Sequence, residues 1–268
     1  MEYKLSMSGK SFILFIDSGI GGLSIAKHLL AKKNEINLIY YADVINFPYG
    51  NKEENEIGRI LLDIYNCLKK KFDIPLIVIA CNTASVSALR FLRENIDIPV
   101  IGTVPAVKLA AKMTENGHIG VIATETTVKL EYLSNLIRDF AHDKQVTVQA
   151  APGMADAAEN DLDQSGILEI LEKELTVFKK NDVDTLVLGC THYSFLFDHI
   201  DRFFNHKIKI VDSREGVANR ILYLMPENVL DNNSERHLIV SDPRKVPIYE
   251  NLNMKLKIFT SINKELCP

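Results

Sequence analysis

The chain has 268 residues, of which 47% are hydrophobic and 25% charged, with a formal net charge of −4 at pH 7, as is ordinary for a soluble globular protein of one large or two modest domains. The mild negative charge gives no sign of nucleic acid or an anionic membrane as a partner. No apolar run reaches the roughly 18 residues of a membrane span, and the run 12–16 is too short for a signal peptide, so we expect a cytoplasmic protein.

Nine apolar runs alternate with helical patterns along the chain. The clearest helical pattern places Ile57, Ile60, Leu61, Ile64 and Leu68 on one face. Continuous apolar runs are typical of buried parallel strands, and their alternation with helices predicts a doubly wound α/β fold. The predicted strands are 12–16, 36–41, 75–80, 98–101, 119–123, 146–150, 184–189, 207–211 and 237–240.

The first predicted strand ends in a glycine-rich turn, Asp17-Ser18-Gly19-Ile20-Gly21-Gly22-Leu23-Ser24. This pattern resembles a dinucleotide fingerprint, with Asp43 in the place of the ribose-binding acid. However, Ser24 replaces the third glycine, and Asp17 would repel a pyrophosphate. The same glycines also suit a tight strand–helix turn, or a loop whose backbone N–H groups bind a small carboxylate.

A turn containing Pro48, Gly50 and Asn51 follows the second predicted strand. These residue types are typical of a surface turn. Because the carboxyl ends of parallel strands lie at one edge of a sheet, we expect this turn to lie beside Asp17. Tyr49 and the backbone of Gly50 could therefore line a cleft.

Two cysteines occupy matching places in two similar segments. The first segment is Leu76-Ile-Val-Ile-Ala-Cys81-Asn82-Thr83-Ala84-Ser85, and the second is Leu186-Val-Leu-Gly-Cys190-Thr191-His192-Tyr193-Ser194. Each cysteine follows an apolar run and precedes a helical pattern. This predicts a position at the carboxyl end of a strand, where ligands of open α/β sheets bind. Two such positions predict a site with one thiol on each side of a substrate.

A lone cysteine is more often a small core residue than a catalytic group. Polar neighbours favour chemistry at Cys81, and we expect the helix that follows to lower the pKa of its thiol. His192 could exchange a proton with Cys190. We expect Cys67 to pack in a helix and Cys267 to have no role. No C-x-x-C spacing indicates zinc, and we expect cytoplasmic thiols to be reduced.

The chain contains an internal repeat. Asp17 and Thr124, each directly after the apolar residues of a predicted strand, are 107 residues apart, and Cys81 and Cys190 are 109 apart. Nearly equal offsets indicate two copies of a strand–helix unit. We therefore expect two pseudo-symmetric doubly wound α/β lobes with the active site in the cleft between them. The first lobe would comprise 1–102 with 210–268, and the second 103–209.

Two opposed thiols suit one class of reaction best. Removing a proton from one face of a carbon and returning one to the other face requires two acid/base groups, and a thiol can take either role. A hydrolase needs only one nucleophile and a base, whereas a reductase would place its thiols within disulfide reach. The sequence shows no pyridoxal phosphate lysine motif and no metal-ligand cluster. We therefore expect racemisation without a cofactor and without a metal.

These motifs together resemble the glutamate racemases of the aspartate/glutamate racemase superfamily. The matching segments are Asp17–Leu23, Asp43–Gly50, Ala80–Ala84 and Gly189–Tyr193, which are spread over about two thirds of the chain in family order. The resemblance implies a cofactor-independent isomerase that interconverts L- and D-glutamate for peptidoglycan synthesis, and so for cell wall and cell shape. We expect a cytoplasmic homodimer that takes glutamate and binds neither nucleic acid nor membrane.

The resemblance also implies roles for individual residues. Cys81 would be the base for D-glutamate, assisted by Asp17, and Cys190 the base for L-glutamate, assisted by His192. The family's second-lobe acid falls on Glu159, although the segment 151–159 otherwise departs from the family's usual Cys-Pro-x-Phe-x-Pro-Leu-Val-Glu pattern. The substrate-binding residues would be Asp17, Ser18, Tyr49, Gly50, Asn82, Thr83, Thr124, Thr191 and His192.

Three other functions stay open on the sequence. A sister racemase of aspartate or another small amino acid would share the two thiols. A chiral assay against several amino acids would distinguish it from a glutamate racemase. A dinucleotide-binding oxidoreductase would bind NAD or NADP. A non-catalytic small-anion binding protein would exchange no proton at the α-carbon.

Overall fold

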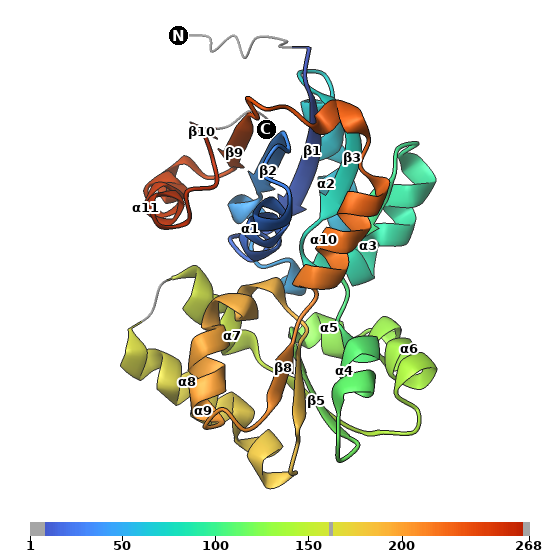
Figure 1. Ribbon diagram of the computed structural model, residues 1–268, viewed down its shortest axis with the longest axis vertical. Coiled ribbons are helices and arrows are strands. Elements are labelled where there is room, and N and C mark those ends of the chain that lie inside the picture. Colours follow the sequence, from blue (N-terminus) through green and yellow to red (C-terminus); the bar gives the residue numbers. More distant parts are fainter. Residues whose placement is uncertain (1–8, 161–162, 265–268) are drawn as a thin grey trace.

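Two lobes, one above the other in Figure 1, make up the molecule. A computed structural model describes residues 9–160 and 163–264, so Cys267 lies outside the described residues. Each lobe is built on its own parallel sheet, which confirms the α/β prediction. Within the described part of the chain, no helix has the length and apolar character that crossing a membrane requires.

The first lobe is built on a six-stranded sheet with the order β10-β9-β2-β1-β3-β4, and the second on a four-stranded sheet with the order β6-β5-β7-β8. Every pair of neighbouring strands is parallel. The strands are β1 Ser11–Asp17, β2 Leu38–Ala42, β3 Asp73–Ile79, β4 Val100–Gly102, β5 His118–Ala123, β6 Gln145–Ala150, β7 Thr185–Leu188, β8 Lys209–Val211, β9 Arg236–Val240 and β10 Ser261–Lys264.

All nine predicted strands are present, and β10 was missed. Its sequence, Ser-Ile-Asn-Lys, contains no apolar run, and it is an edge strand that pairs only with β9. The α-helices are α1 Leu23–Lys32, α2 Glu54–Leu68, α3 Asn82–Asn95, α4 Val107–Met113, α5 Glu125–Lys129, α6 Glu131–Phe140, α7 Pro152–Glu159, α8 Gln164–Lys180, α9 Phe197–Phe203, α10 Arg214–Leu224 and α11 Val246–Leu256. Short 3-10 helices are η1 Val44–Asn46, η2 Tyr49–Asn51, η3 Thr191–Leu196, η4 Glu227–Val229 and η5 Pro243–Lys245.

The internal repeat is visible in the strand order. The order β2-β1-β3-β4 in the first sheet matches β6-β5-β7-β8 in the second. Cys81 comes two residues after β3 and Cys190 two residues after β7, which are equivalent strands. The added strands β9 and β10, together with α11, extend the first lobe beyond the repeat. The exact lobe boundaries at 102/103 and 209/210 stay a prediction.

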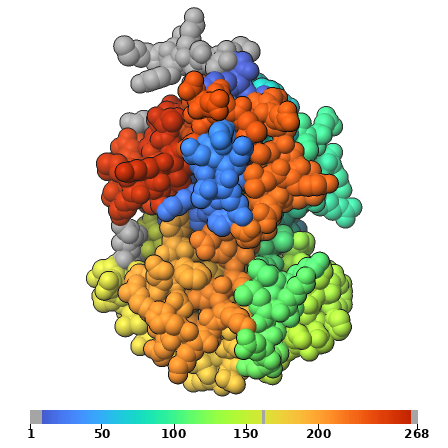
Figure 2. Space-filling view, in the orientation of Figure 1, coloured from blue at the N-terminus to red at the C-terminus, as the bar shows by residue number. Residues whose placement is uncertain are grey.

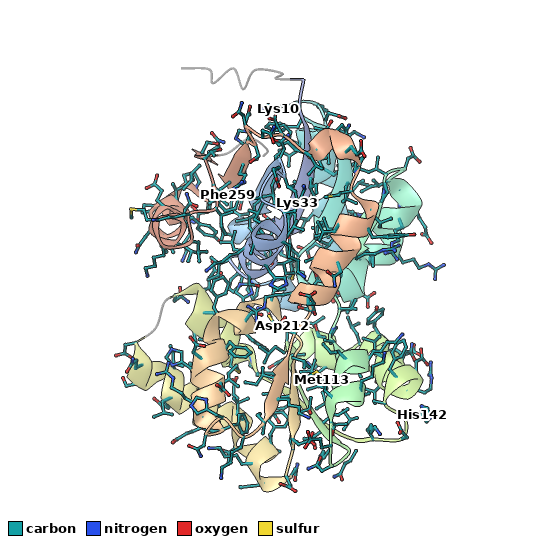
Figure 3. All side chains as sticks on the ribbon, viewed as in Figure 1. Lys10, Lys33, Met113, His142, Asp212 and Phe259 are labelled. Carbon is teal, nitrogen blue, oxygen red and sulfur yellow. The ribbon has the colours of Figure 1, made fainter. Side chains whose placement is uncertain are left out.

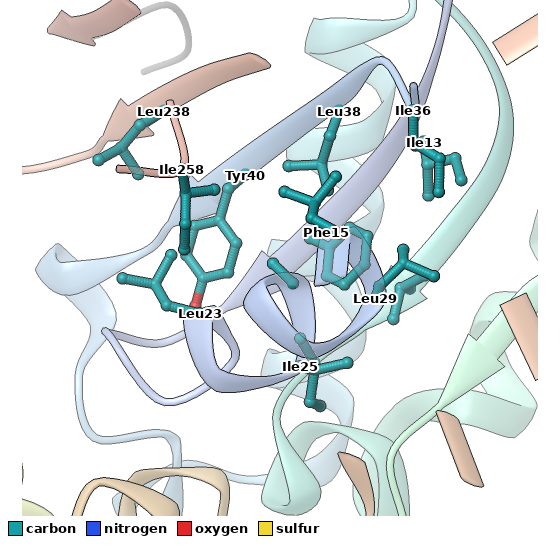
Figure 4. Close-up of a cluster of buried hydrophobic side chains, with 14 of the residues drawn as sticks. Ile13, Phe15, Leu23, Ile25, Leu29, Ile36, Leu38, Tyr40, Leu238 and Ile258 are labelled. Atoms are coloured by element: carbon teal, nitrogen blue, oxygen red, sulfur yellow. The ribbon is translucent and has the colours of Figure 1, made fainter. Parts of the chain in front are cut away.

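Alternate residues of β1 pack into two different cores, because side chains of a strand point to opposite faces of the sheet. Ile13 and Phe15 join the cluster that includes buried residues of α1, α10 and α11, and Figure 4 shows part of this cluster around Phe15 and Tyr40. Leu14 and Ile16 join the cluster beneath α2 and α3. Helices therefore cover both faces of the first sheet, which leaves its strand ends free to form a site.

Cys67 lies in α2 and packs against the second of these clusters, as predicted. It is disulfide-bonded, however, so the expectation of a reduced thiol is wrong at this position. Cys81 and Cys190 are free cysteines.

The chain crosses between the lobes after β4 and again after β8, at the waist marked by Asp212 in Figure 3. The two crossings are joined, because Ser213 Oγ donates a hydrogen bond to the carbonyl of Val104 at 2.6 Å. In the space-filling view, the C-terminal segment lies on the upper lobe beside the α1 region, above the lower lobe (Figure 2). The lobes are thus held together at the waist and by contacts within the site.

Candidate active site

The two strand-end cysteines face a single cavity between the lobes. Cys81 and Cys190 are each only 6% exposed, and both line a cavity of about 190 Å³. Predicted site residues that also line it are Ser18, Tyr49, Gly50, Thr83, Thr124 and His192. Phe47, Pro48 and Asn51, from the turn that was expected beside Asp17, also line it, although none was predicted as a site residue. Lining residues that the sequence did not indicate are Glu125, Pro152, Ala155 and Asp156.

The size of this cavity limits what it can hold. Sites for drug-sized ligands usually measure roughly 300–1,000 Å³, so a cavity of about 190 Å³ suits a small metabolite and not a dinucleotide. A larger cavity of about 460 Å³ lies at the crossings, beside Val104 and Ser213, and contains neither cysteine. The smaller cavity is the candidate active site because it holds the reactive side chains.

The glycine-rich turn is pressed against the second lobe. A Cβ atom at Gly19 would collide with Glu159, and one at Gly21 would collide with Thr191 and His192. The absent side chains therefore allow the lobes to approach each other. The dinucleotide interpretation of this turn is wrong, because protein atoms of the second lobe fill the space that a pyrophosphate would need.

Asp17 fixes the shape of this turn. Its Oδ1 accepts a hydrogen bond from the backbone N–H of Gly19 at 2.8 Å, and its Oδ2 accepts one from Gly22 at 2.9 Å. Thr191 Oγ1, from the second lobe, also donates to Oδ2 at 3.2 Å. Burial raises the pKa of Asp17 to about 6, although the positive charge of His192 and the Gly19 N–H lower it in part.

Cys81 has a polar neighbour that connects it to Asp17. Ser18 Oγ lies 4.0 Å from Cys81 Sγ and 3.5 Å from Asp17 Oδ1. Burial, together with the charge of Asp17, raises the pKa of the Cys81 thiol well above its usual value. The expectation that the start of α3 would lower this pKa is therefore wrong, because loss of hydration outweighs the helix dipole.

Cys190 has a histidine beside it. His192 Nδ1 lies 3.9 Å from Cys190 Sγ, and His192 Nε2 lies 3.0 Å from Glu159 Oε2. Burial disfavours a charged imidazole, but the hydrogen bonds to Cys190 and Glu159 outweigh it and raise the pKa of His192 well above its usual value. These contacts favour the charged imidazole, which can exchange a proton with the thiol.

Glu159 receives hydrogen bonds from both lobes. Besides His192, its Oε2 accepts from the backbone N–H of Ile20 at 3.0 Å. Its Oε1 accepts from the hydroxyl of Tyr249 at 3.1 Å. Sequence reasoning missed Tyr249, because it lies in α11, far along the chain from every motif.

Of the predicted substrate-binding residues, Asp17, Asn82 and Thr191 do not line the cavity, whereas the other six do. The Tyr49 hydroxyl donates a hydrogen bond to Asp43 Oδ2 at 2.7 Å, so Tyr49 offers a ligand its ring and its backbone. Thr83 and Thr124 meet across the lobes, with 2.9 Å between their hydroxyl oxygens. The Asn82 side-chain nitrogen is a buried donor without a hydrogen-bond partner among the described residues. It is a ready donor beside Cys81.

Phe47 also lines the site, and Thr126 contacts a residue that lines it; sequence reasoning named neither as a site residue. The rings of Phe47 and His192 lie 5.6 Å apart, and the Thr126 hydroxyl donates to the carbonyl of Gly50 across the lobes. Among the described residues, no group of three or more His, Cys, Asp or Glu side chains is arranged to hold a metal ion.

Comparison with known proteins agrees with this geometry. The sequence profile of the family described as Asp/Glu/hydantoin racemase matches residues 24–220. A glutamate racemase from Shewanella halifaxensis is 35% identical over 96% of this chain and 97% of its own. One from Histophilus somni is 38% identical over 80% of each chain.

Solved structures show the same fold. The chain is similar to Escherichia coli glutamate racemase in complex with L-glutamate and the activator UDP-MurNAc-Ala, with a TM-score of 0.83, 30% identity and coverage of 95% of this chain and 98% of the other. It is similar also to glutamate racemase from Francisella tularensis in complex with D-glutamate, with a TM-score of 0.78, 25% identity and coverage of 96% and 98%.

The contact at Gly21 leads to a first prediction. Gly21→Ala should lower the free energy of unfolding by about 1–3 kcal/mol, because the added methyl group overlaps Thr191 and His192. Gly216→Ala in α10 is the matched control. A Cβ there meets nothing within 4 Å, and alanine is the better helix former, so this variant should gain about 0.5–1 kcal/mol. Urea unfolding of both variants checks the prediction, and equal stability of the two would contradict the contact.

The raised pKa of Asp17 predicts a pH dependence of stability. Between its ordinary value of 3.8 and about 6, the folded protein binds a proton at Asp17 that the unfolded chain does not. The contribution of Asp17 to the free energy of unfolding should therefore fall by about 3 kcal/mol as the pH rises through this window. Urea unfolding at pH 4 and pH 7, compared between the natural protein and Asp17→Asn, measures this contribution. If the difference in the free energy of unfolding between the two proteins did not change with pH, the prediction would be contradicted.

Proposed function

The chain belongs to the Asp/Glu/hydantoin racemase family, and from that premise we propose that Cys81 and Cys190 exchange protons with opposite faces of the α-carbon of glutamate. The function is that of an amino-acid racemase, an isomerase that interconverts L- and D-glutamate. One observation supports the two-thiol mechanism above all others. Two free cysteines, each at the end of an equivalent strand in a different lobe, line the same small cavity.

In the direction from L- to D-glutamate, the Cys190 thiolate removes the α-proton. The electron pair of the C–H bond stays on the α-carbon and delocalises into the α-carboxylate. The Cys81 thiol then donates its proton to the opposite face. In the reverse direction the two cysteines exchange roles, because the acid in one direction is the base in the other.

The neighbours of each thiol suit these roles. His192 lies within reach of Cys190 and, as a charged imidazole, can donate a proton to the Cys190 thiolate and take it back, while Glu159 fixes the other ring nitrogen. The high pKa of Cys81 favours its thiol form, which is the proton donor toward D-glutamate. For Cys81 to act as a base, a positive charge beside it is needed, and the α-ammonium of the substrate supplies one.

The glutamate carboxylates would be held by hydroxyl and backbone N–H donors at helix starts, where anions bind well. Such donors surround the cavity at η2, α3 and η3. We assign this binding to Ser18, Tyr49, Gly50, Asn82, Thr83, Thr124 and Thr191.

Location and assembly are further parts of the proposal. A cytoplasmic enzyme would meet free glutamate and supply D-glutamate for peptidoglycan. A homodimer is supported by exposed apolar side chains that a second copy could cover, among them Tyr223 at 78% and Met254 at 69% exposure. Sedimentation of the purified protein measures the assembly.

Purified protein should racemise glutamate in both directions without added cofactor and in the presence of EDTA, because two thiols suffice for both proton transfers. Chiral chromatography of glutamate, aspartate and several other amino acids measures the activity and its selectivity. A requirement for pyridoxal phosphate or a metal would contradict the mechanism, and a preference for aspartate would favour the sister racemases. Absence of all α-proton exchange in D₂O would favour a binding protein.

The two thiols should be separable by half-reactions. Elimination of HCl from a chloro analogue of glutamate needs only one proton abstraction. Cys190→Ser should abolish elimination from the L-analogue and spare the D-analogue, and Cys81→Ser should do the reverse, because serine is a far weaker acid and base in this role. Either serine variant should lose racemisation.

Cys67→Ser is the control for this experiment, since Cys67 lies in α2 and does not line the cavity. It should leave both eliminations unchanged. Equal loss of elimination from both enantiomers in both active-site variants would rule out opposed bases.

A further inference from the structure

We propose that Tyr249 is a positioning residue for one of the two bases: its hydroxyl, presented by the first lobe, holds Glu159 where that carboxylate orients His192 beside Cys190. The inference rests on the proposed function, because it assigns Tyr249 to one direction of the racemisation.

The contacts form a continuous chain from Tyr249 to the thiol. The Tyr249 hydroxyl donates to Glu159 Oε1 at 3.1 Å. Glu159 Oε2 lies 3.0 Å from His192 Nε2, and His192 Nδ1 lies 3.9 Å from Cys190 Sγ. Because Nε2–H is donated to the carboxylate, Nδ1 is the atom that faces the thiol.

Every member of this chain is buried. Tyr249 is 1% exposed, Glu159 5%, His192 2% and Cys190 6%. In a site shielded from water, a missing hydrogen-bond donor is not replaced by solvent. Burial, followed by the charge of Glu159, raises the pKa of Tyr249 well above its usual value, so its hydroxyl keeps the proton that it donates.

The donor comes from the opposite lobe. The ring of Tyr249 packs in the core of the first lobe, with residues of β1, β2 and α1, whereas Glu159 ends α7 in the second lobe. Two first-lobe donors, Ile20 N–H and the Tyr249 hydroxyl, therefore hold both oxygens of the carboxylate. Orientation of His192 is thus completed only when the lobes meet.

The Cys81 side is supported differently. Asp17 is held by backbone N–H groups of its own turn and by Thr191, and none of these contacts involves α11. Loss of the Tyr249 hydroxyl should therefore slow proton transfer at Cys190 and leave transfer at Cys81 nearly unchanged.

Steady-state racemisation alone cannot reveal this asymmetry. Since the two enantiomers have equal free energy in water, kcat/KM must change equally in both directions. Half-reactions and isotope effects separate the two transfers. The experiment therefore compares Tyr249→Phe with the natural protein in elimination from the L- and D-chloro analogues, and Cys190→Ser identifies which enantiomer depends on Cys190.

Tyr249→Phe should lower the rate of elimination from the Cys190-dependent enantiomer about tenfold, and from the other enantiomer by less than about twofold. The tenfold loss is a fraction of the roughly 10²–10⁴-fold rate increase that a well-positioned acid or base contributes. The primary isotope effect on α-deuterated glutamate should rise for the Cys190-dependent enantiomer and fall for the other, because abstraction by Cys190 becomes the slower step.

Two controls separate positioning from loosening of the lobes. Thr126→Val removes another hydroxyl contact between the lobes, to the Gly50 carbonyl, and should lower both eliminations to the same degree. In a Glu159→Gln background, Tyr249→Phe should have little further effect on the Cys190-dependent elimination, because the two residues act as one unit.

Equal loss from both enantiomers in Tyr249→Phe, or an undiminished effect in the Glu159→Gln background, would overturn the assignment of Tyr249 while leaving the racemase intact. A natural protein that neither racemises nor eliminates would instead overturn the proposed function. Thermal unfolding of each variant establishes that it is folded under the assay conditions.

Discussion

The close approach of the glycine-rich turn to the second lobe is the constraint on which the site depends. Gly19 and Gly21 leave no space for a side chain between the lobes, and Thr191 reaches across to Asp17. A side chain at either glycine would hold the two lobes apart at this point. Direct contact instead places both thiols on one cavity and removes water from the groups that transfer protons.

A cluster of ionisable groups is buried around this contact, and each member depends on the others. An isolated buried charge is strongly disfavoured. Here Asp17, Glu159 and His192 lie in one dry region, and opposite charges offset part of the loss of hydration. The pKa values of Asp17 and His192 both rise, but for different reasons. Burial favours the neutral acid at Asp17, whereas the hydrogen bonds to Glu159 and Cys190 favour the charged imidazole of His192.

Much of the fold could be predicted because its causes are local. Buried parallel strands need continuous apolar runs, and β10 escaped detection because its four residues contain no such run. Both cysteines were found because strand ends in α/β proteins are where ligands bind. Other features depend on contacts between distant parts of the chain. The packing role of Gly21 and the contact of Tyr249 with Glu159 arise only when the lobes meet. The direction of the Cys81 pKa shift follows from burial and from the charge of Asp17, which becomes its neighbour only in the folded chain.

The matching strand order of the two sheets bears on the energy profile of the reaction. A racemase works between two states of equal free energy, and the higher of its two barriers limits its rate. Two lobes of the same topology place equivalent thiols at equivalent strand ends, but the groups that support the two thiols differ. The extension β9–β10 and α11 belongs to one lobe alone. Substitutions in this extension can therefore change the barrier at one thiol relative to the barrier at the other, without altering either cysteine.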